Sequence, residues 1–277
     1  MATEVFAPAK VNLTLHVTGR RDDGYHLLDS LVAFADAGDR LAIALADRPG
    51  LDVTGPLAAG VPVGDENLVL RAARLMGADV RINLDKHLPA AAGLGGGSSD
   101  AAACLRAVAE LTGRPVPDAQ AAATLGADVP VCLVARAARM RGIGEGIAPL
   151  AAMPPLHAVL VNPGVAVPTG AVFSRMTQIS NPPMPAQLPN WPDAAALIGW
   201  LAAQRNDLQE PAIALQPVIG DVLKAIGRQP GCGLSRMSGS GATCFGLFPT
   251  PDAAHRAARG LDRPGWPGWW VRAVTLS

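Results

Sequence analysis

The amino-acid sequence predicts an α+β fold built in two lobes. The first half of the chain contains segments with strand-like alternation, and a helical pattern follows a glycine-rich turn at residues 89–99. Strands and helices then alternate again after a proline-rich stretch, without internal repeats. Because 277 residues exceed the length of a typical single domain, two lobes are the expected organisation.

The composition is that of a globular protein without a charge bias. Apolar residues make up 49% of the chain and charged residues 17%, which argues against a disordered or fibrous protein. Lys plus Arg and Asp plus Glu each number 23, so neither a nucleic acid nor an acidic membrane surface is an expected partner. The four cysteines form no Cys-x-x-Cys pair and are expected to be reduced, buried thiols.

No targeting or membrane-spanning segment is expected. Residues 1–20 contain Glu4, Lys10 and Asn12, which interrupt the apolar run that a signal peptide needs. No stretch approaches the ~18 consecutive apolar residues that suggest a membrane span. The expected location is therefore the cytoplasm.

Strands are predicted at three places in the first lobe. Residues 11–17 alternate strictly, and the polar face of this strand carries Lys10, Asn12, Thr14 and His16. Similar alternation occurs at residues 41–45 and 80–84.

Helices are predicted between and after these strands. Residues 68–76 follow the capping-competent run Asp65–Asn67, and residues 101–111 show helical spacing that ends at Gly113. A short helix is expected after Asp118.

The second lobe is expected to begin near the start of a proline-rich stretch at residues 149–192, because prolines interrupt regular structure. The predicted lobes are residues 1–152 and 153–277. Within the second lobe the expected strands and helices are residues 159–161, 218–226, 244–248, a final helix capped by Thr250, and 271–274.

The glycine-rich turn is the strongest functional signal. It follows a predicted strand, precedes a predicted helix, and contains four glycines in five positions, which let a ligand approach the backbone. The unpaired N–H groups and the dipole of the following helix favour an anion such as a triphosphate. A flexible surface turn is the alternative interpretation. The residues of the turn are Pro89, Ala90, Ala91, Ala92, Gly93, Leu94, Gly95, Gly96, Gly97, Ser98 and Ser99.

Two common nucleotide motifs do not match. Gly97 is followed by Ser98 and Ser99 rather than by the lysine of a Walker-type loop. A dinucleotide fingerprint would require a third glycine at position 98. The two serines can donate hydroxyl groups to a ligand or cap the helix, and the sequence leaves both roles open.

The turn resembles the second motif of the kinase superfamily that includes galactokinase, homoserine kinase, mevalonate kinase and phosphomevalonate kinase. With five further motifs in the same order, the pattern is similar to the family of 4-diphosphocytidyl-2-C-methyl-D-erythritol kinases. These motifs are Pro8–Leu13, Gly24–His26, Leu125–Pro130, Asn206–Leu208 and Ser238–Ala242.

The resemblance implies a two-lobed small-molecule kinase fold, with an N-terminal mixed β/α lobe that carries the glycine-rich ATP loop and a C-terminal ferredoxin-like α/β lobe. It implies ATP as co-substrate with Mg²⁺, and transfer of phosphate to the 2-hydroxyl of a cytidine-diphospho-methylerythritol in the non-mevalonate isoprenoid route. Asp128 matches the family's catalytic carboxylate, and Lys10 matches the lysine that orients it. Taken alone, Lys10 could be a solvated strand lysine and Asp128 a turn or cap acid.

The resemblance also implies roles for other residues. Substrate-binding positions are Asn12, Tyr25, His26, Thr169 and Phe173, with the aromatic rings stacking on the cytosine. Further ATP-pocket positions are Asn67 and Lys86, and the turn near the active site contains Gly239 and Gly241. The local alternatives are a helix cap for Asn67, a strand-end lysine for Lys86, an aromatic plug for Tyr25, and a plain turn for Gly239 and Gly241. No protein ligand of Mg²⁺ is assigned.

Overall fold

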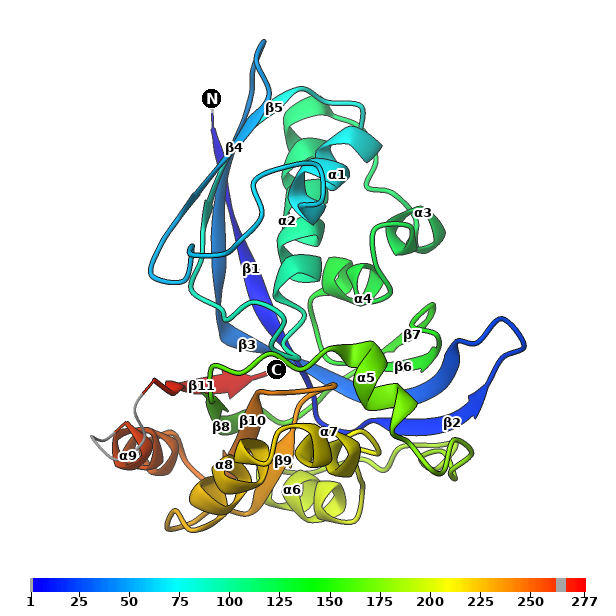
Figure 1. Ribbon diagram of the computed structural model, residues 1–277, viewed down its shortest axis with the longest axis vertical. Coiled ribbons are helices and arrows are strands. Elements are labelled where there is room, and N and C mark those ends of the chain that lie inside the picture. Colours follow the sequence, from blue (N-terminus) through cyan, green and yellow to red (C-terminus); the bar gives the residue numbers. More distant parts are fainter. Residues whose placement is uncertain (1, 263–267) are drawn as a thin grey trace. The chain divides into compact units, whose positions relative to one another are not determined.

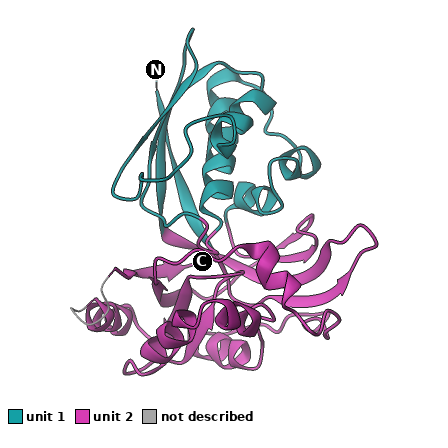
Figure 2. Ribbon diagram, in the orientation of Figure 1, with its two compact units in different colours: residues 1–10, 37–90, 95–135 teal, residues 11–36, 91–94, 136–277 magenta. Residues whose placement is uncertain are grey.

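A computed structural model describes residues 2–262 and 268–277 (Figure 1). The chain forms two compact units, each made of separate stretches of sequence (Figure 2). Unit 1 comprises residues 1–10, 37–90 and 95–135, and unit 2 comprises residues 11–36, 91–94 and 136–277. The units do not coincide with the predicted lobes 1–152 and 153–277, because strands β1 (Thr3–Asn12) and β3 (His26–Leu45) each contribute residues to both units.

Unit 1 is a mixed sheet covered by helices. In the sheet, β5 pairs parallel with β4 and antiparallel with β3, and β3 also pairs with β1. Helices α1 and α2 pack against each other (Figure 1). The elements are β1 (Thr3–Asn12), β3 (His26–Leu45), β4 (Gly50–Thr54), β5 (Val80–Asp85), α1 (Leu68–Leu75), α2 (Gly96–Thr112), α3 (Ala119–Ala123) and α4 (Val129–Val134).

The helix after the glycine-rich turn begins earlier than predicted. The apolar spacing suggested a start near Ala101, whereas α2 begins at Gly96. The left-handed conformation of Gly95, with a φ of +62°, ends the loop there, so that Ser98 and Ser99 lie in the first turn of the helix. The predicted end is confirmed, since Gly113 caps α2 with a φ of +67°.

The predicted strand at residues 11–17 was wrong as a single element. β1 ends at Asn12, and β2 begins only at His16. Between them, the backbone N–H groups of residues 13 and 14 both donate to the carbonyl of Leu31, while Leu15 N donates to Arg205 O. These hydrogen bonds to different partners turn the chain, which alternation of residue types does not reveal.

Unit 2 is a largely antiparallel sheet with helices packed on it. The sheet order is β3-β11-β8-β10-β9, and α8 and α9 contact β8 and β10. The buried core contains Val159, Val161, Ile219, Val222 and Phe248. The elements are β2 (His16–Arg20), β6 (Ala138–Gly142), β7 (Gly146–Pro149), β8 (Leu156–Asn162), β9 (Leu234–Met237), β10 (Cys244–Phe248), β11 (Trp270–Leu276), α5 (Thr169–Ser174), α6 (Ala194–Ala202), α7 (Gln209–Leu215), α8 (Val218–Gly227) and α9 (Pro251–Leu261).

The predicted start of the final helix is confirmed. The Thr250 side chain accepts a hydrogen bond from Ala253 N, and Pro251 opens α9 as predicted. The proline-rich stretch nevertheless contains β8 and α5. None of the helices in the described ranges is long and apolar enough to cross a membrane.

Candidate active site

The centre of the candidate site in unit 1 is a contact between Lys10 and Asp128. Lys10 Nζ lies 2.6 Å from Asp128 Oδ2, although 118 positions separate the residues. The Lys10 side chain is 4% exposed and that of Asp128 is 34% exposed, so a ligand can reach the carboxylate. Asp128 precedes α4, but its side chain makes no capping hydrogen bond. A solvated lysine and a capping acid therefore do not describe these residues.

The glycine-rich turn presents backbone N–H groups at the start of α2. Ser99 N donates to Gly95 O at 2.8 Å, and the N–H groups of residues 96–98 precede this bond. A Cβ on Gly95 would come within 3.3 Å of Lys10 Cβ, so the turn packs directly on the strand that carries the lysine. The unpaired N–H groups and the helix dipole make this end of α2 suitable for phosphate oxygens.

The two serines of the turn have different surroundings. Ser99 Oγ is buried and donates to Pro8 O at 2.7 Å, which fixes α2 to β1. Ser98 Oγ has no hydrogen-bond partner in the described part of the chain, and a Cβ on Gly126 would lie 3.8 Å from it. Ser98 therefore lies beside the segment that leads into Asp128, with its hydroxyl available to a ligand.

The middle of the turn packs on residues Ser238–Ala242, here called the third motif, within unit 2. Ser238 Oγ donates to Gly93 O at 2.8 Å, and Thr243 N donates to Ala92 O at 3.1 Å. A Cβ on Gly93 would lie 2.3 Å from Ser238 O, and a Cβ on Gly239 would lie 3.2 Å from Gly93 O. Only glycine allows this close approach of two backbones.

Asn12 presents a buried acceptor without a partner. Its Nδ2 donates to Ser30 Oγ at 2.8 Å, and its backbone N–H donates to Ser238 Oγ at 3.0 Å. Asn12 Oδ1 is buried and accepts no hydrogen bond from the described residues. Because a buried polar atom normally has a partner, this oxygen is suited to a hydroxyl or amine of a ligand.

The aromatic residues predicted to read a base lie in unit 2. His26 and Phe173 stack with ring centroids 4.4 Å apart and planes 16° apart. Burial, together with the nearby Arg20, lowers the pKa of His26 below 6.5, so the ring is neutral at neutral pH. Tyr25 is 61% exposed and is stacked on neither ring. The structure therefore brings two of the three predicted rings together.

Thr169 lies close to the third motif. It is the first residue of α5, the helix that also carries Phe173, and its Oγ1 is 2.8 Å from Ser240 Oγ. Within unit 2, Thr169, a predicted substrate-binding residue, is thus hydrogen-bonded to the turn that contains Gly239 and Gly241.

Asn67 and Lys86, the other two predicted ATP-pocket residues, are engaged within unit 1. Asn67 Oδ1 accepts from Val69 N at 2.9 Å as the cap of α1, and its Nδ2 donates to Pro62 O. Lys86 is buried, and its ammonium binds Asp39 and Asp100. Asn67 is therefore a helix cap, and the Lys86 side chain is occupied by two carboxylates of the same unit.

Sequence reasoning missed three residues that support the turns. Asp39 and Asp100 bind Lys86. Asn206 Nδ2 donates to the carbonyls of Met237 and Gly239, both at 2.8 Å, and so holds the third motif from a distant segment. A signal existed for Asn206, which lies in a matched motif, and for Asp100, which follows the two serines. No sequence signal marked Asp39.

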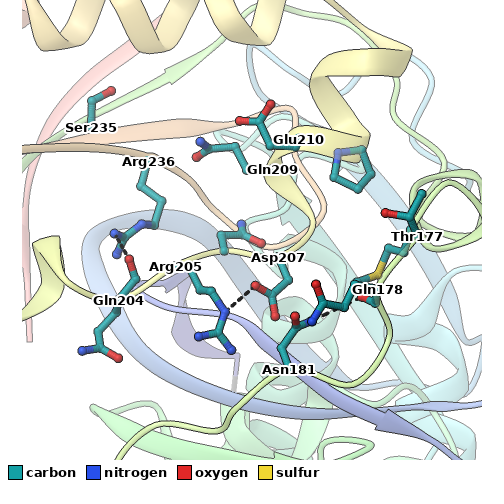
Figure 3. Close-up of a pocket in the computed structure, with 13 residues that line it drawn as sticks. Thr177, Gln178, Asn181, Gln204, Arg205, Asp207, Gln209, Glu210, Ser235 and Arg236 are labelled. Atoms are coloured by element: carbon teal, nitrogen blue, oxygen red, sulfur yellow. Dashed lines mark hydrogen bonds and ion pairs between the residues drawn. The ribbon is translucent and has the colours of Figure 1, made fainter.

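A cavity of about 470 Å³ in unit 2 contains none of the predicted site residues (Figure 3). It is lined by polar side chains that include Gln178, Asn181, Arg205 and Glu210. Asp207, also in its wall, accepts hydrogen bonds from Arg205 Nε and Val17 N. Because Arg205 and Asp207 bind each other, their charges are compensated within the wall.

A protein-held metal centre is not formed by the described residues. Within residues 2–262 and 268–277, no three His, Cys, Asp or Glu side chains are grouped to hold an ion. Within unit 1, the candidate site consists of the ammonium–carboxylate pair of Lys10 and Asp128 and the N–H groups at the start of α2.

Known proteins are similar to this chain in sequence and in fold. Family models described as the GHMP kinases N terminal domain and GHMP kinases C terminal match residues 67–136 and 186–265. The 4-diphosphocytidyl-2-C-methyl-D-erythritol kinase of Cereibacter sphaeroides is 57% identical, over 99% of both chains. That of Dinoroseobacter shibae is 61% identical, over 98% of this chain and 94% of the relative.

A solved structure of 4-(cytidine 5'-diphospho)-2C-methyl-D-erythritol kinase superimposes with a TM-score of 0.81 at 40% identity, covering 99% of both chains. The predicted two-lobed α+β kinase fold is thus confirmed. On the combined strength of its motifs, its full-length relatives and its fold, the chain belongs to the GHMP kinases, in the family of 4-diphosphocytidyl-2-C-methyl-D-erythritol kinases.

Proposed function

We propose that this kinase transfers the γ-phosphoryl group of ATP to the 2-hydroxyl of 4-diphosphocytidyl-2-C-methyl-D-erythritol. The products are the 2-phosphate and ADP, and the reaction belongs to the non-mevalonate route to isoprenoid precursors. The full-length relatives support the choice of substrate.

The contact between Lys10 and Asp128 carries the mechanistic part of the proposal. Asp128 accepts the proton of the substrate hydroxyl. At the same time the hydroxyl oxygen bonds to the γ-phosphorus, and the bond between the γ-phosphorus and the β-phosphate oxygen breaks. The Lys10 ammonium holds the carboxylate in position and offsets negative charge on the reacting oxygens. Positioning and charge stabilisation of this kind provide most of the rate gain in phosphoryl transfer.

The N–H groups of residues 96–98 and the Ser98 hydroxyl are assigned to the phosphates of ATP, because none of them has a partner among the described residues and they lie at the positive end of the α2 dipole. Magnesium enters with the nucleotide as MgATP, in which phosphate and water oxygens supply most of its ligands. Four free cysteines support the cytoplasm as the location, since a reducing compartment keeps thiols free.

Base recognition is assigned to unit 2. The His26–Phe173 stack provides a flat apolar surface for the cytosine, and Tyr25 on the preceding turn supplies a third ring. Asn12 Oδ1 is the proposed acceptor for a substrate hydroxyl because it is buried without a partner in the described part of the chain.

The test is a coupled assay of ADP release with MgATP and each of three acceptors: the cytidine substrate, mevalonate and homoserine. Turnover is expected with the cytidine substrate alone, and ³¹P NMR of the product should place the new phosphate on the 2-hydroxyl. Faster turnover of mevalonate or homoserine by folded protein would overturn the proposed substrate. Absence of ADP release with every acceptor would overturn the kinase activity itself.

A further inference from the structure

Three charged side chains form a buried network in unit 1, behind the glycine-rich turn. Lys86 Nζ lies 2.8 Å from Asp100 Oδ2 and also binds Asp39 Oδ2. The side chains of Lys86, Asp100 and Asp39 are 5%, 3% and 0% exposed. Each residue comes from a different place: Asp39 from β3, Lys86 from the end of β5, and Asp100 from α2.

This network is a costly way to fill the interior. Two carboxylates share one ammonium, and a buried ion pair often contributes less stability than apolar residues of the same volume. Burial, with the neighbouring Asp39, raises the pKa of Asp100 to about 7 against the opposing effect of Lys86. Asp100 Oδ1 is buried and has no hydrogen-bond partner among the described residues. Folding stability alone does not account for such an arrangement.

The network connects the two ends of the glycine-rich turn. Asp39 Oδ1 accepts hydrogen bonds from His87 N at 2.6 Å and Leu88 N at 2.9 Å, immediately before the turn. Lys86 links this anchored segment to Asp100 in α2, immediately after the turn. The strand end and the helix start are therefore held together by side chains behind the backbone.

The network also lies against the N–H groups that face the phosphates. A Cβ on Gly96 would come within 3.7 Å of Lys86 Nζ and 3.8 Å of Asp39 Oδ2. Gly96 is the first residue of α2, so the network packs against the residue at which the helix begins. The Lys86 ammonium is buried and bound to both carboxylates, which favours an effect on a nucleotide through the turn over direct contact.

We propose that Asp39, Lys86 and Asp100 are positioning residues for ATP: they hold both ends of the glycine-rich turn so that its N–H groups match the phosphates. This inference rests on the proposed kinase activity. The expected signature is a weakened ATP interaction with little change in the acceptor interaction, since the network does not touch the residues assigned to the base.

Three variants test the proposal. Asp100→Ala removes the link to α2 and should raise the KM for ATP about tenfold, with the KM for the acceptor changed less than about twofold. Asp100→Asn keeps a carbonyl acceptor for Lys86 and should restore most of the ATP affinity. Asp39→Asn can still accept from His87 N and Leu88 N, but it turns an amide toward the ammonium, so it should weaken ATP about as much as Asp100→Ala.

Asp118→Ala is the matched control, since it removes the cap of α3 in the same unit without contacting the turn. It should lower the melting temperature and leave the KM for ATP unchanged. ADP affinity, measured by calorimetry without the acceptor, separates this proposal from the proposed function: loss of ADP binding in Asp39→Asn supports it even if the acceptor were misassigned. If Asp100→Ala does not fold, the nucleotide affinity of Asp39→Asn is compared with that of Asp100→Asn, and the proposal expects the weaker binding in Asp39→Asn. If Asp39→Asn and Asp100→Asn had the same affinity for ATP as each other, and likewise for ADP, the positioning role would be overturned.

Discussion

Arg139 holds Asp29 by two parallel hydrogen bonds, from Nε to Oδ1 at 2.7 Å and from Nη2 to Oδ2 at 2.6 Å. The same guanidinium donates to the carbonyls of Met184, Pro185 and Ala186, and Met184 N donates to Asp29 Oδ2. This buried pair in unit 2 therefore fastens the proline-rich segment to β3 and β6. The segment is anchored by side chains that are distant in sequence.

Arg139→Ala should lower the free energy of unfolding by about 3–5 kcal/mol, because it leaves the Asp29 carboxylate buried without its cation. Arg141→Ala is the matched control on the same strand. Arg141 Nε is 3.8 Å from Asp29 and its side chain is 53% exposed, so its loss should cost less than about 1 kcal/mol. Urea unfolding measures both values, and similar losses in the two variants would contradict the anchoring role.

Asp128→Asn should lower kcat by about 10²–10⁴-fold while ADP binding stays within about threefold of the original protein, since the amide cannot accept the hydroxyl proton. Asp52→Asn provides the control, because Asp52 pairs with Arg81 on the exposed part of the same unit. Single-turnover kinetics and calorimetry give the two quantities. A kcat close to the original value would remove Asp128 from the role of base.

Gly95→Ala and Gly113→Ala compare the two ends of α2. Both glycines are left-handed, with φ of +62° and +67°, so each substitution should cost about 1–2 kcal/mol of stability. Only Gly95→Ala adds a Cβ against Lys10, whereas the space around Gly113 is open. The KM for ATP should therefore rise about tenfold in Gly95→Ala alone. An equal KM for ATP in the two variants would contradict a role of the glycine-rich turn in nucleotide binding.

Phe173→Leu should raise the KM for the cytidine substrate about tenfold, because stacking on a base is worth about 1–3 kcal/mol. The KM for ATP should change little. Phe6→Leu, at a partly exposed phenylalanine of unit 1, serves as the control and should alter neither constant. An increase confined to the KM for ATP in Phe173→Leu would contradict base recognition by this ring.

His16 should make the protein less stable at mildly acidic pH. Burial lowers its pKa below 6.5 and Arg205 acts in the same direction, while Asp207 and Asp29 oppose them. The folded state thus binds fewer protons at this site than the unfolded chain, so this contribution is complete above pH 6.5 and is lost as the pH falls below it. The fall in unfolding free energy between pH 7.5 and 5.5 should be smaller in His16→Gln. The exposed His255→Gln should retain the original fall, and identical profiles for all three proteins would contradict the assignment.

Much of the fold could be predicted because its signals are local. Asn67 and Thr250 cap helices, Gly113 ends one, and alternation marks β5, all within a few residues of sequence. The helix Val129–Val134 was missed because its β-branched apolar residues are typical of a strand, and its packing against α2 overrides that preference.

The candidate site could be predicted only as a set of residues. The ordered motifs identified Lys10, Asp128, the glycine-rich turn and the third motif, and full-length relatives confirmed the family. The contact between Lys10 and Asp128 spans 118 positions, which no local pattern reports.

The sequence by itself determined the family, the chemistry of the glycine-rich turn and the identity of the charged pair, because each depends on residue type and short spacing. Only the tertiary structure decided which polar groups are free to act. Ser99 and Lys86 are bound by Pro8, Asp39 and Asp100, whereas Asn12 Oδ1 has no partner among the residues that the structure describes. A buried group is available to a ligand only when packing leaves it unpaired, and segments far apart in the chain supply the packing.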